Sequence, residues 1–258
     1  VTLPDGELDI LVDKEAPSLN MVPDTANEYG YYNADVSVQI RAEEAESRDE
    51  TNAALNGYSG IDTVEYWVTC DGTITQGKGY TDGDTTDNGI LYEYVSGETI
   101  ISEVEKRVVV MADRNNSDNV VLHVAVTDRA GNTGEEQLPL KINTTVPEFS
   151  YTMTGTKDAA AMEGYYNTDR TAVITYIDRA DSFDKALAYN GIKILARDVD
   201  GNEMPMNAEY LNPVWQENGD IHILTLTFSR DANYEWSISY TNKAGSEAAE
   251  GTGTGEDL

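Results

Sequence analysis

Apolar and more polar residues alternate at every second position along several short segments of the chain. Residues 36–40, 120–126 and, more loosely, 221–228 each place apolar side chains on one face. Turn-forming pairs such as Asp71-Gly72 separate these segments. A period of two in short segments bounded by glycine turns is typical of half-buried antiparallel strands. The pattern predicts an all-β chain of antiparallel sandwiches, with residues 182–188 as its one helical piece.

The two halves of the sequence resemble each other in three blocks that occur in the same order. The blocks pair residues 30–35 (GYYNAD) with 164–169 (GYYNTD), residues 60–61 with 191–192 (both GI), and residues 119–132 with 233–246 without a gap. Such self-similarity indicates two copies of one structural unit. One β-sandwich of the immunoglobulin type needs about 100 residues, so a chain of 258 residues accommodates two.

The boundaries of the units repeat as well. Residues 8–17 (LDILVDKEAP) resemble residues 138–147 (LPLKINTTVP), which lie 130 positions further on. We predict the following segments from this spacing: residues 1–13 as a lead-in strand or the end of a preceding repeat, residues 14–143 as domain 1 with an insertion near residues 74–105, and residues 144–258 as domain 2. The closing strand of domain 2 is expected shortly before Gly251.

A short hairpin motif and a linker suggest a family. In residues 127–132 (TDRAGN), Gly131 supplies a positive φ, and the side chains of Asp128 and Asn132 can bond to the turn backbone. Together with the linker at residues 13–17 (DKEAP), this hairpin resembles the tandem bacterial immunoglobulin-like (Big-type) domains of Gram-positive cell-surface proteins. The resemblance implies two immunoglobulin-like sandwiches, an extracellular location at the bacterial surface or in secreted form, and neighbouring immunoglobulin-like domains of the parent chain as partners.

Charge narrows the range of partners. The chain has 17 Lys and Arg against 47 Asp and Glu, a formal net charge of −30 at pH 7. A field of that sign disfavours nucleic acid and anionic lipid as partners. The longest apolar runs fall far short of the roughly 20 residues of a membrane-spanning helix, so we predict no membrane insertion. Cys70 is the only cysteine, which excludes an intrachain disulfide and fits a bacterial envelope protein.

Candidate catalytic residues are few. The two histidines, His123 and His222, lie outside any zinc-binding HExxH motif, and neither a nucleophile elbow nor a phosphate-binding P-loop occurs. His123 falls on the polar face of its predicted strand, which favours an exposed sheet residue over a catalytic base. We therefore predict no enzymatic activity. The chain is interpreted as a non-catalytic extracellular spacer or adhesion module of a larger bacterial surface protein, whose partner could be a host or cell-wall glycan or protein.

Aromatic residues support an alternative interpretation. The sequence has 16 Tyr and 3 Trp against 3 Phe, and such amphipathic rings can stack on sugars. Trp236 replaces the inward-facing Leu122 of the first copy and is expected in the core, whereas Trp215 follows Asn-Pro-Val in an expected loop. The alternative is a carbohydrate-binding module accessory to a secreted glycan-degrading enzyme, with Trp215 as the stacking residue.

Calcium is the candidate ion, although no cofactor is required. Calcium takes six to eight oxygen ligands, and several acidic segments could provide them. The candidate ligands are Asp82, Asp84 and Asp87 in one acidic turn, Asp198 and Asp200 in another, and Asp128, which could combine with Asp13 and Glu15 of the linker. The competing interpretation is that these acids serve their turns. The second copy has Asn242 in place of Asp128 and is not expected to bind an ion in the same way.

Overall fold

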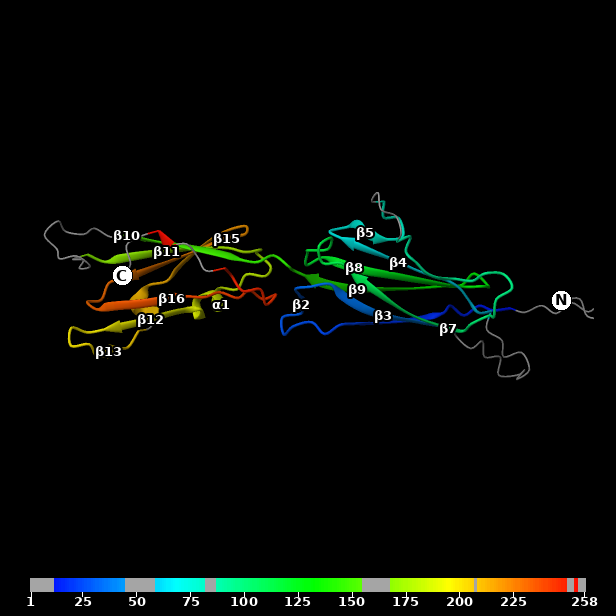
Figure 1. The fold of residues 1–258 in the computed structure, drawn as a ribbon, viewed down its shortest axis with the longest axis horizontal. Helices are drawn as coiled ribbons and strands as arrows, with labels where there is room; N and C mark the ends of the chain where they lie inside the picture. Colours follow the sequence, from blue (N-terminus) through cyan, green and yellow to red (C-terminus); the bar gives the residue numbers. More distant parts are fainter. Residues whose placement is uncertain are drawn as a thin grey trace, which may run out of the picture. The chain divides into compact units, whose positions relative to one another are not determined.

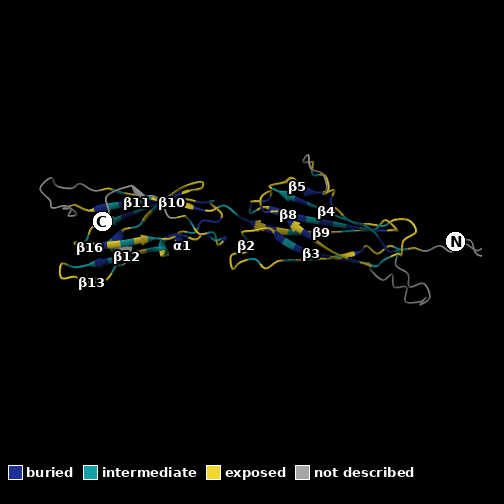
Figure 2. Ribbon diagram, in the orientation of Figure 1, coloured by how far each residue is buried: buried dark blue, intermediate teal, exposed yellow. Residues whose placement is uncertain are grey.

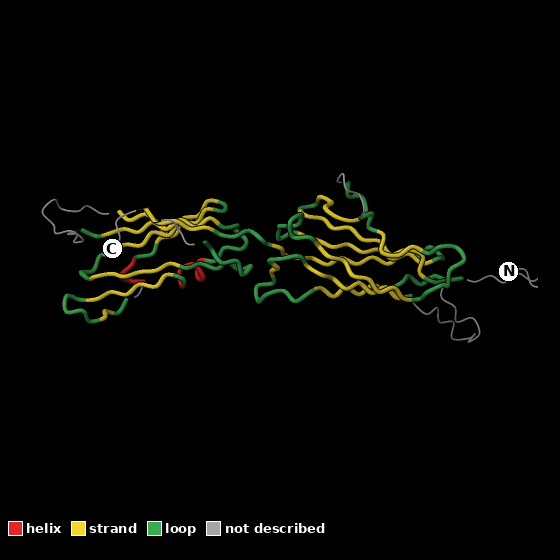
Figure 3. Tube along the Cα trace, in the orientation of Figure 1, coloured by secondary structure: helices red, strands yellow, loops and turns green. Residues whose placement is uncertain are grey.

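The computed structural model describes residues 12–44, 59–81, 87–154, 168–206, 208–249 and 253–254. The chain separates by contacts into two compact units, unit 1 (Val1–Ala26 with Ala34–Ile142) and unit 2 (Asn27–Asn33 with Asn143–Leu258). Strands dominate both units, and the helices among these described residues are short (Figures 1 and 3). The prediction of an all-β, antiparallel sandwich fold is confirmed.

Two sheets contain the strands of the first part of the chain. The smaller sheet has the order β1-β3-β7, with β1 at Ser18–Pro23, β3 at Val36–Glu43 and β7 at Glu103–Val110. The larger sheet has the order β2-β9-β8-β4-β5, with β6 paired to β4. Its strands are β2 (Tyr31–Tyr32), β4 (Ile61–Cys70), β5 (Thr73–Gly77), β6 (Ile90–Glu93), β8 (Val120–Asp128) and β9 (Thr133–Ile142).

The alternation seen in the sequence generates the core of unit 1. Along β8 every second residue is buried, from Val120 to Asp128, and β3 alternates in the same way (Figure 2). Val38, Ile40, Leu122 and Val124 are each at most 1% exposed. Burial of such a side chain contributes about 1.5 to 3 kcal/mol, so the matched inward faces of the two sheets stabilise the unit.

Unit 2 repeats this architecture. One sheet has the order β14-β15-β11-β10-β17 and the other the order β13-β12-β16. The strands are β10 (Glu148–Thr154), β11 (Arg170–Ile177), β12 (Ile192–Arg197), β13 (Glu203–Met204), β14 (Val214–Asn218), β15 (Ile221–Phe228), β16 (Asn233–Ile238) and β17 (Gly253–Thr254). Aromatic residues contribute to the core, where the ring of Tyr176 contacts Phe149, Phe183 and Tyr240.

Two helices interrupt the strands of unit 2. The helix α1 (Lys185–Asn190) begins at the N-cap Asp184, whose side chain accepts hydrogen bonds from the backbone of Ala186 and Leu187. It overlaps the predicted helical piece at residues 182–188. The second helix, α2 (Ala208–Leu211), was not predicted, and four residues carry too little periodicity to show in a sequence.

The strand after the repeated hairpin differs between the copies. In unit 1, β8 pairs antiparallel with β4 on one side and with the ten-residue β9 on the other. In unit 2, β16 pairs antiparallel with β12, and the described part of the chain provides no strand on its other side. The last described strand, β17, pairs in parallel with β10 in the other sheet.

Several sequence predictions can be located on this fold. The segment near residues 74–105 contributes most of β5, all of β6 and the start of β7 to the sheets. Most of the predicted lead-in segment, residues 1–11, and residues 164–167 of the second GYYN motif lie outside the described residues.

Candidate metal centre

The hairpin between β8 and β9 is a rigid turn at one edge of unit 1. The backbone N–H of Asn132 donates to the Asp128 carboxylate at 2.8 Å, and its side-chain amide donates to the other carboxylate oxygen at 2.7 Å. Gly131 has a φ of 92°, which favours glycine. Asp128 ends β8 on its inward face and is 1% exposed. The hairpin thus holds a carboxylate inside the sandwich.

Three carboxylates meet at this hairpin. Oxygen atoms of Asp13, Glu44 and Asp128 lie within 4.8 Å of one another, and this is the one group of metal-ligating side chains with such spacing in the described ranges. Asp13 lies before β1, Glu44 follows β3, and Asp128 ends β8. The amide of Asn132 also donates to the backbone carbonyl of Asp13 at 3.3 Å, which ties the entering chain to the hairpin.

The pKa of Asp13 and the pKa of Glu44 are shifted in opposite directions. Burial alone would raise the pKa of Asp13, but hydrogen bonds from Ser59 and from the backbone of Glu15 outweigh it and hold that pKa below its ordinary value. Desolvation, followed by the charges of Asp128 and Asp13, raises the pKa of Glu44 to about 7. Ser59 donates to one oxygen of Glu44 at 3.3 Å, whereas the other oxygen is buried without a hydrogen-bond partner.

This arrangement needs a positive charge or a proton. Two ionised carboxylates 4.8 Å apart repel each other by about 3.5 kcal/mol at an effective dielectric constant of about 20. A proton on Glu44 removes part of the repulsion, and a hard divalent cation bound between the carboxylates offsets it by attraction. Calcium fits carboxylate ligands, because it accepts mono- or bidentate oxygens and fills its remaining positions with water.

At the equivalent position of unit 2, the described residues do not form a group of three carboxylates. Asp178 follows β11 as Glu44 follows β3, and it is 2% exposed. Its carboxylate accepts hydrogen bonds from the hydroxyls of Tyr240 (2.7 Å) and Ser182 (3.0 Å) and from the amide of Asn242 (3.2 Å). Asn242 is the counterpart of Asp128. Neutral donors therefore stabilise one carboxylate in unit 2, where unit 1 brings three carboxylates together.

The structure brings together two of the three residues expected at the linker, and calcium binding there stays a prediction. Asp13 and Asp128 come together as expected, but Glu15 is exposed and its place is taken by Glu44. Glu44 was missed because it is distant in sequence from both partners. The repeat itself contained a signal, since Glu44 and Asp178 are acids at the same distance after the two GYYN motifs.

The other predicted calcium ligands serve turns where they are described. Asp87 accepts hydrogen bonds from the Tyr66 hydroxyl and the Gly89 backbone, and Asp82 and Asp84 lie outside the described residues. Asp198 accepts the side-chain and backbone N–H groups of Asn202, which lower its pKa, and the backbone N–H of Asp200. The side chain of Asp200 is exposed.

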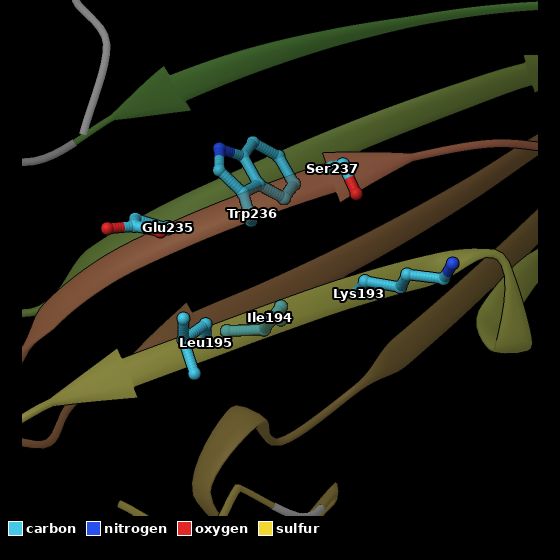
Figure 4. A pocket seen from close by; sticks show the side chains of 6 residues that line it. All are labelled: Lys193, Ile194, Leu195, Glu235, Trp236 and Ser237. Carbon is cyan, nitrogen blue, oxygen red and sulfur yellow. The ribbon is translucent and has the colours of Figure 1, made fainter. Parts of the chain in front are cut away.

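Both tryptophans of unit 2 are half-buried and pack against its core, as expected for Trp236 but not for Trp215. Trp215 lies in β14 rather than in a loop, is half-buried, and its ring contacts Tyr176 and Phe183. The reason is that β14 pairs with β15 directly after Asn212 and Pro213. Trp236 is also half-buried and lines a shallow cavity (Figure 4). The role of Trp215 in glycan stacking stays a prediction.

The histidines have different surroundings. His123 is half-buried on the outer face of β8, where its ring stacks on Trp67 with centroids 4.9 Å apart and burial lowers its pKa. His222 is only 2% exposed and stacks on Phe183. Its neighbours on β15 alternate, and this position faces the core.

Fold and site together define an all-β protein of antiparallel sheets with a partly buried carboxylate cluster. No family model and no curated protein matches the chain. Among solved structures it is similar to SGBP-B of the Bacteroides ovatus mixed-linkage glucan utilization locus, in complex with a mixed-linkage heptasaccharide. The sequence identity is 14%, the match covers 93% of this chain and 48% of that chain, and the TM-score is 0.24. The chain thus spans about half the length of that protein, and a likeness this low carries no argument about ligand.

Among the described residues, no helix has the length and apolar character that crossing a bilayer requires.

Proposed function

We propose that this chain is a non-catalytic extracellular spacer or adhesion segment of a larger bacterial surface protein, and that unit 1 binds calcium through Asp13, Glu44 and Asp128. The ion fixes the chain where it enters the first sandwich. Its partners are neighbouring immunoglobulin-like domains of the parent chain and a glycan or protein of the host or cell wall.

One observation carries the calcium proposal. Three carboxylates converge on a point where one oxygen of Glu44 is buried without a hydrogen-bond donor. Buried acceptors without partners are rare, because each costs about 1 to 3 kcal/mol. The equivalent carboxylate in unit 2, Asp178, has three donors. A cation supplies in unit 1 the positive charge that hydroxyl and amide hydrogens supply in unit 2.

Isothermal titration calorimetry of the metal-free full chain tests this proposal. We expect one calcium ion per chain, and at least about tenfold weaker binding for Glu44→Gln and Asp128→Asn. Glu15→Gln is the matched control, because Glu15 is an exposed acid beside Asp13 and should leave the affinity unchanged. Absence of binding at millimolar calcium, or an equal loss in Glu15→Gln, would contradict the assignment of calcium to this cluster.

A further inference from the structure

A buried histidine of unit 2 has an oxygen atom in front of each of its ring nitrogens. The ring of His222 stacks on Phe183 with centroids 3.7 Å apart. Its Nε2 lies 3.1 Å from the backbone oxygen of Asp178. Its Nδ1 lies 3.5 Å from a carboxylate oxygen of Glu217, and this buried nitrogen has no hydrogen-bond partner among the described residues. Both nitrogens of His222 therefore face an acceptor.

A neutral imidazole satisfies only one of these two acceptors. The neutral ring has one N–H donor and one nitrogen lone pair, so one of its nitrogens would turn a lone pair toward an oxygen. The imidazolium has an N–H on each nitrogen and can donate to both oxygens. Its positive charge is also attracted by the face of the Phe183 ring, as in other cation–π contacts. The surroundings of His222 are therefore complementary to its protonated form.

The carboxylate that faces Nδ1 is itself held in place. Lys185 of α1 forms an ion pair with Glu217 of β14 at 2.9 Å. The hydrogen bond from Lys185, its charge and a smaller contribution of His222 outweigh desolvation and hold the pKa of Glu217 below its ordinary value. Glu217 is therefore ionised at neutral pH. Its side chain is 46% exposed, so solvent can deliver a proton to this site or remove one.

The other titratable groups around the ring have their own partners or stay neutral. Three nearby carboxylates accept other hydrogen-bond donors: Asp178, Asp184 and Asp220. Burial raises the pKa of Tyr176, which lies opposite His222 on β11, and of Tyr240, so both phenols keep their protons. Glu217 is thus the acid that a proton on Nδ1 would bind.

The strand β14 depends on contacts at this histidine. Among the described strands, β14 is an edge strand that pairs only with β15, and Glu217 lies opposite His222 in that pairing. Trp215, two residues earlier on β14, contacts Phe183, the same ring on which His222 stacks. The other residues of β14 are exposed. Segments with few buried contacts open more easily than the core, so the attachment of β14 relies on Trp215 and Glu217.

We propose that His222, Glu217 and Lys185 form a pH-sensitive switch that fastens β14 and α1 to β15. When His222 is protonated, its Nδ1 donates to Glu217, which Lys185 connects to α1. When this proton leaves, a nitrogen lone pair faces the carboxylate and β14 loosens. The edge of unit 2 that contains Trp215 is thus closed in acidic surroundings and opens more readily in alkaline ones.

Nitrogen NMR of the imidazole rings in the isotope-labelled full chain tests the protonation. The sequence has two histidines, and His123→Gln assigns their signals. We expect both nitrogens of the His222 ring to carry a proton at about pH 5, and only one of them at about pH 8. In Glu217→Gln the second proton should be lost at a lower pH than in the wild type, because the opposing charge is absent.

Glu203→Gln is the matched control for this experiment. It removes an exposed acid of unit 2 that pairs with Arg197, and His222 should titrate in it as in the wild type. A His222 ring that is neutral at both pH values, or that titrates alike in Glu217→Gln and the wild type, overturns the proposal.

Amide hydrogen exchange tests whether this proton holds β14. At about pH 5, the amides of Val214–Asn218 that bond to β15 should exchange at least about tenfold faster in Glu217→Gln than in the wild type, because a bond between charged groups is lost. At about pH 8 the difference should disappear, since the wild-type ring has then lost its second proton. Each comparison is made at one pH, so the intrinsic pH dependence of exchange cancels. Equal exchange at the lower pH, a difference that persists at the higher pH, or the same acceleration in Glu203→Gln contradicts the switch.

Discussion

In the metal-free protein, we expect the stability of unit 1 to change with pH through Glu44. Its carboxyl lies beside two acids that have hydrogen-bond donors of their own. Asp128 accepts two hydrogen bonds from Asn132, and at Asp13 the hydrogen bonds outweigh burial and lower the pKa. Without a cation, protonation of Glu44 is the route by which the cluster relieves its repulsion. The residue therefore links the stability of unit 1 to pH.

The pH dependence has a definite sign. Folding raises the pKa of Glu44 from its ordinary value of 4.5 to about 7 through desolvation and the charges of Asp128 and Asp13. The resulting stabilisation is fully present below about pH 4.5 and is lost as the pH rises through about 7. We expect the free energy of unfolding of the metal-free chain, measured in urea, to fall over this range. Glu44→Gln should flatten the dependence, and Glu15→Gln should preserve it; an unchanged slope in Glu44→Gln would exclude this residue as the source.

The sequence alone identifies Asp13 and Asp128 as candidate calcium ligands, but it does not identify Glu44. The first two lie in motifs, a linker and a hairpin, that carry local turn chemistry. Glu44 is one of two adjacent glutamates at the end of a strand, and only the packing of its sheet against the sheet that contains β8 and β9 brings it to the hairpin. Contacts of that kind depend on strand order, which short-range patterns do not encode.

At the scale of elements, β4 is the strand on which the larger sheet of unit 1 depends, because β5, β6 and β8 all pair with it. The chain folds back tightly here: the backbone of Tyr66 bonds to both Gly89 and Lys78. A Cβ on Gly89 would lie 2.1 Å from the Lys78 nitrogen and 2.5 Å from the Tyr66 oxygen. The absence of a side chain at residue 89 thus permits this packing.

Substitution of Gly89 should destabilise unit 1 more than substitution of an open-turn glycine. Gly89→Ala combines a φ of 76° with backbone overlap, and we expect a loss of about 3 kcal/mol or more. Gly72→Ala has a similar φ of 80° with nothing within 4 Å, so strain alone should cost about 1 to 2 kcal/mol. Urea unfolding of both variants measures the difference; similar losses would mean that the loop moves to make room.

The element predictions succeed where one face is clearly apolar. The alternation of β3 and β8 needs only local sequence, and both strands lie where it predicts them. The strand β14 was missed because Asn212 and Pro213 are loop-forming residues and Val214–Asn218 has few apolar positions. The hydrogen bonds of β14 to β15 hold this segment as a strand, although its own residues show little apolar alternation.

On the scale of the whole molecule, the two units surround the carboxylate at the corresponding position, Glu44 or Asp178, with different groups. Unit 1 gathers acids, whereas unit 2 surrounds Asp178 with hydroxyl and amide donors. Their stabilities should consequently respond to different variables. A formal charge of −30 also makes the chain sensitive to salt, so ionic strength must be fixed in any comparison.

Differential scanning calorimetry should resolve this difference. Calcium at about 100 times its dissociation constant stabilises the state that binds it by about 2.7 kcal/mol, which raises the midpoint of a domain of this size by on the order of 10 °C. We expect this rise in one of two transitions. Asp178→Asn should lower only the other transition, because it weakens bonds within unit 2. A calcium shift of both transitions, or of neither, would contradict the assignment of the ion to unit 1.

The position of Asp13 has a mechanical consequence. A surface protein stretched by flow transmits tension along its backbone, and tension entering unit 1 from its N-terminal side reaches Asp13 before it reaches β1 at Ser18. An ion that joins Asp13 to Glu44 and Asp128 would pass that pull directly to the ends of β3 and β8, before the first inter-strand hydrogen bond of β1 is strained. The rupture force of the unit would then follow the calcium content of the surrounding fluid.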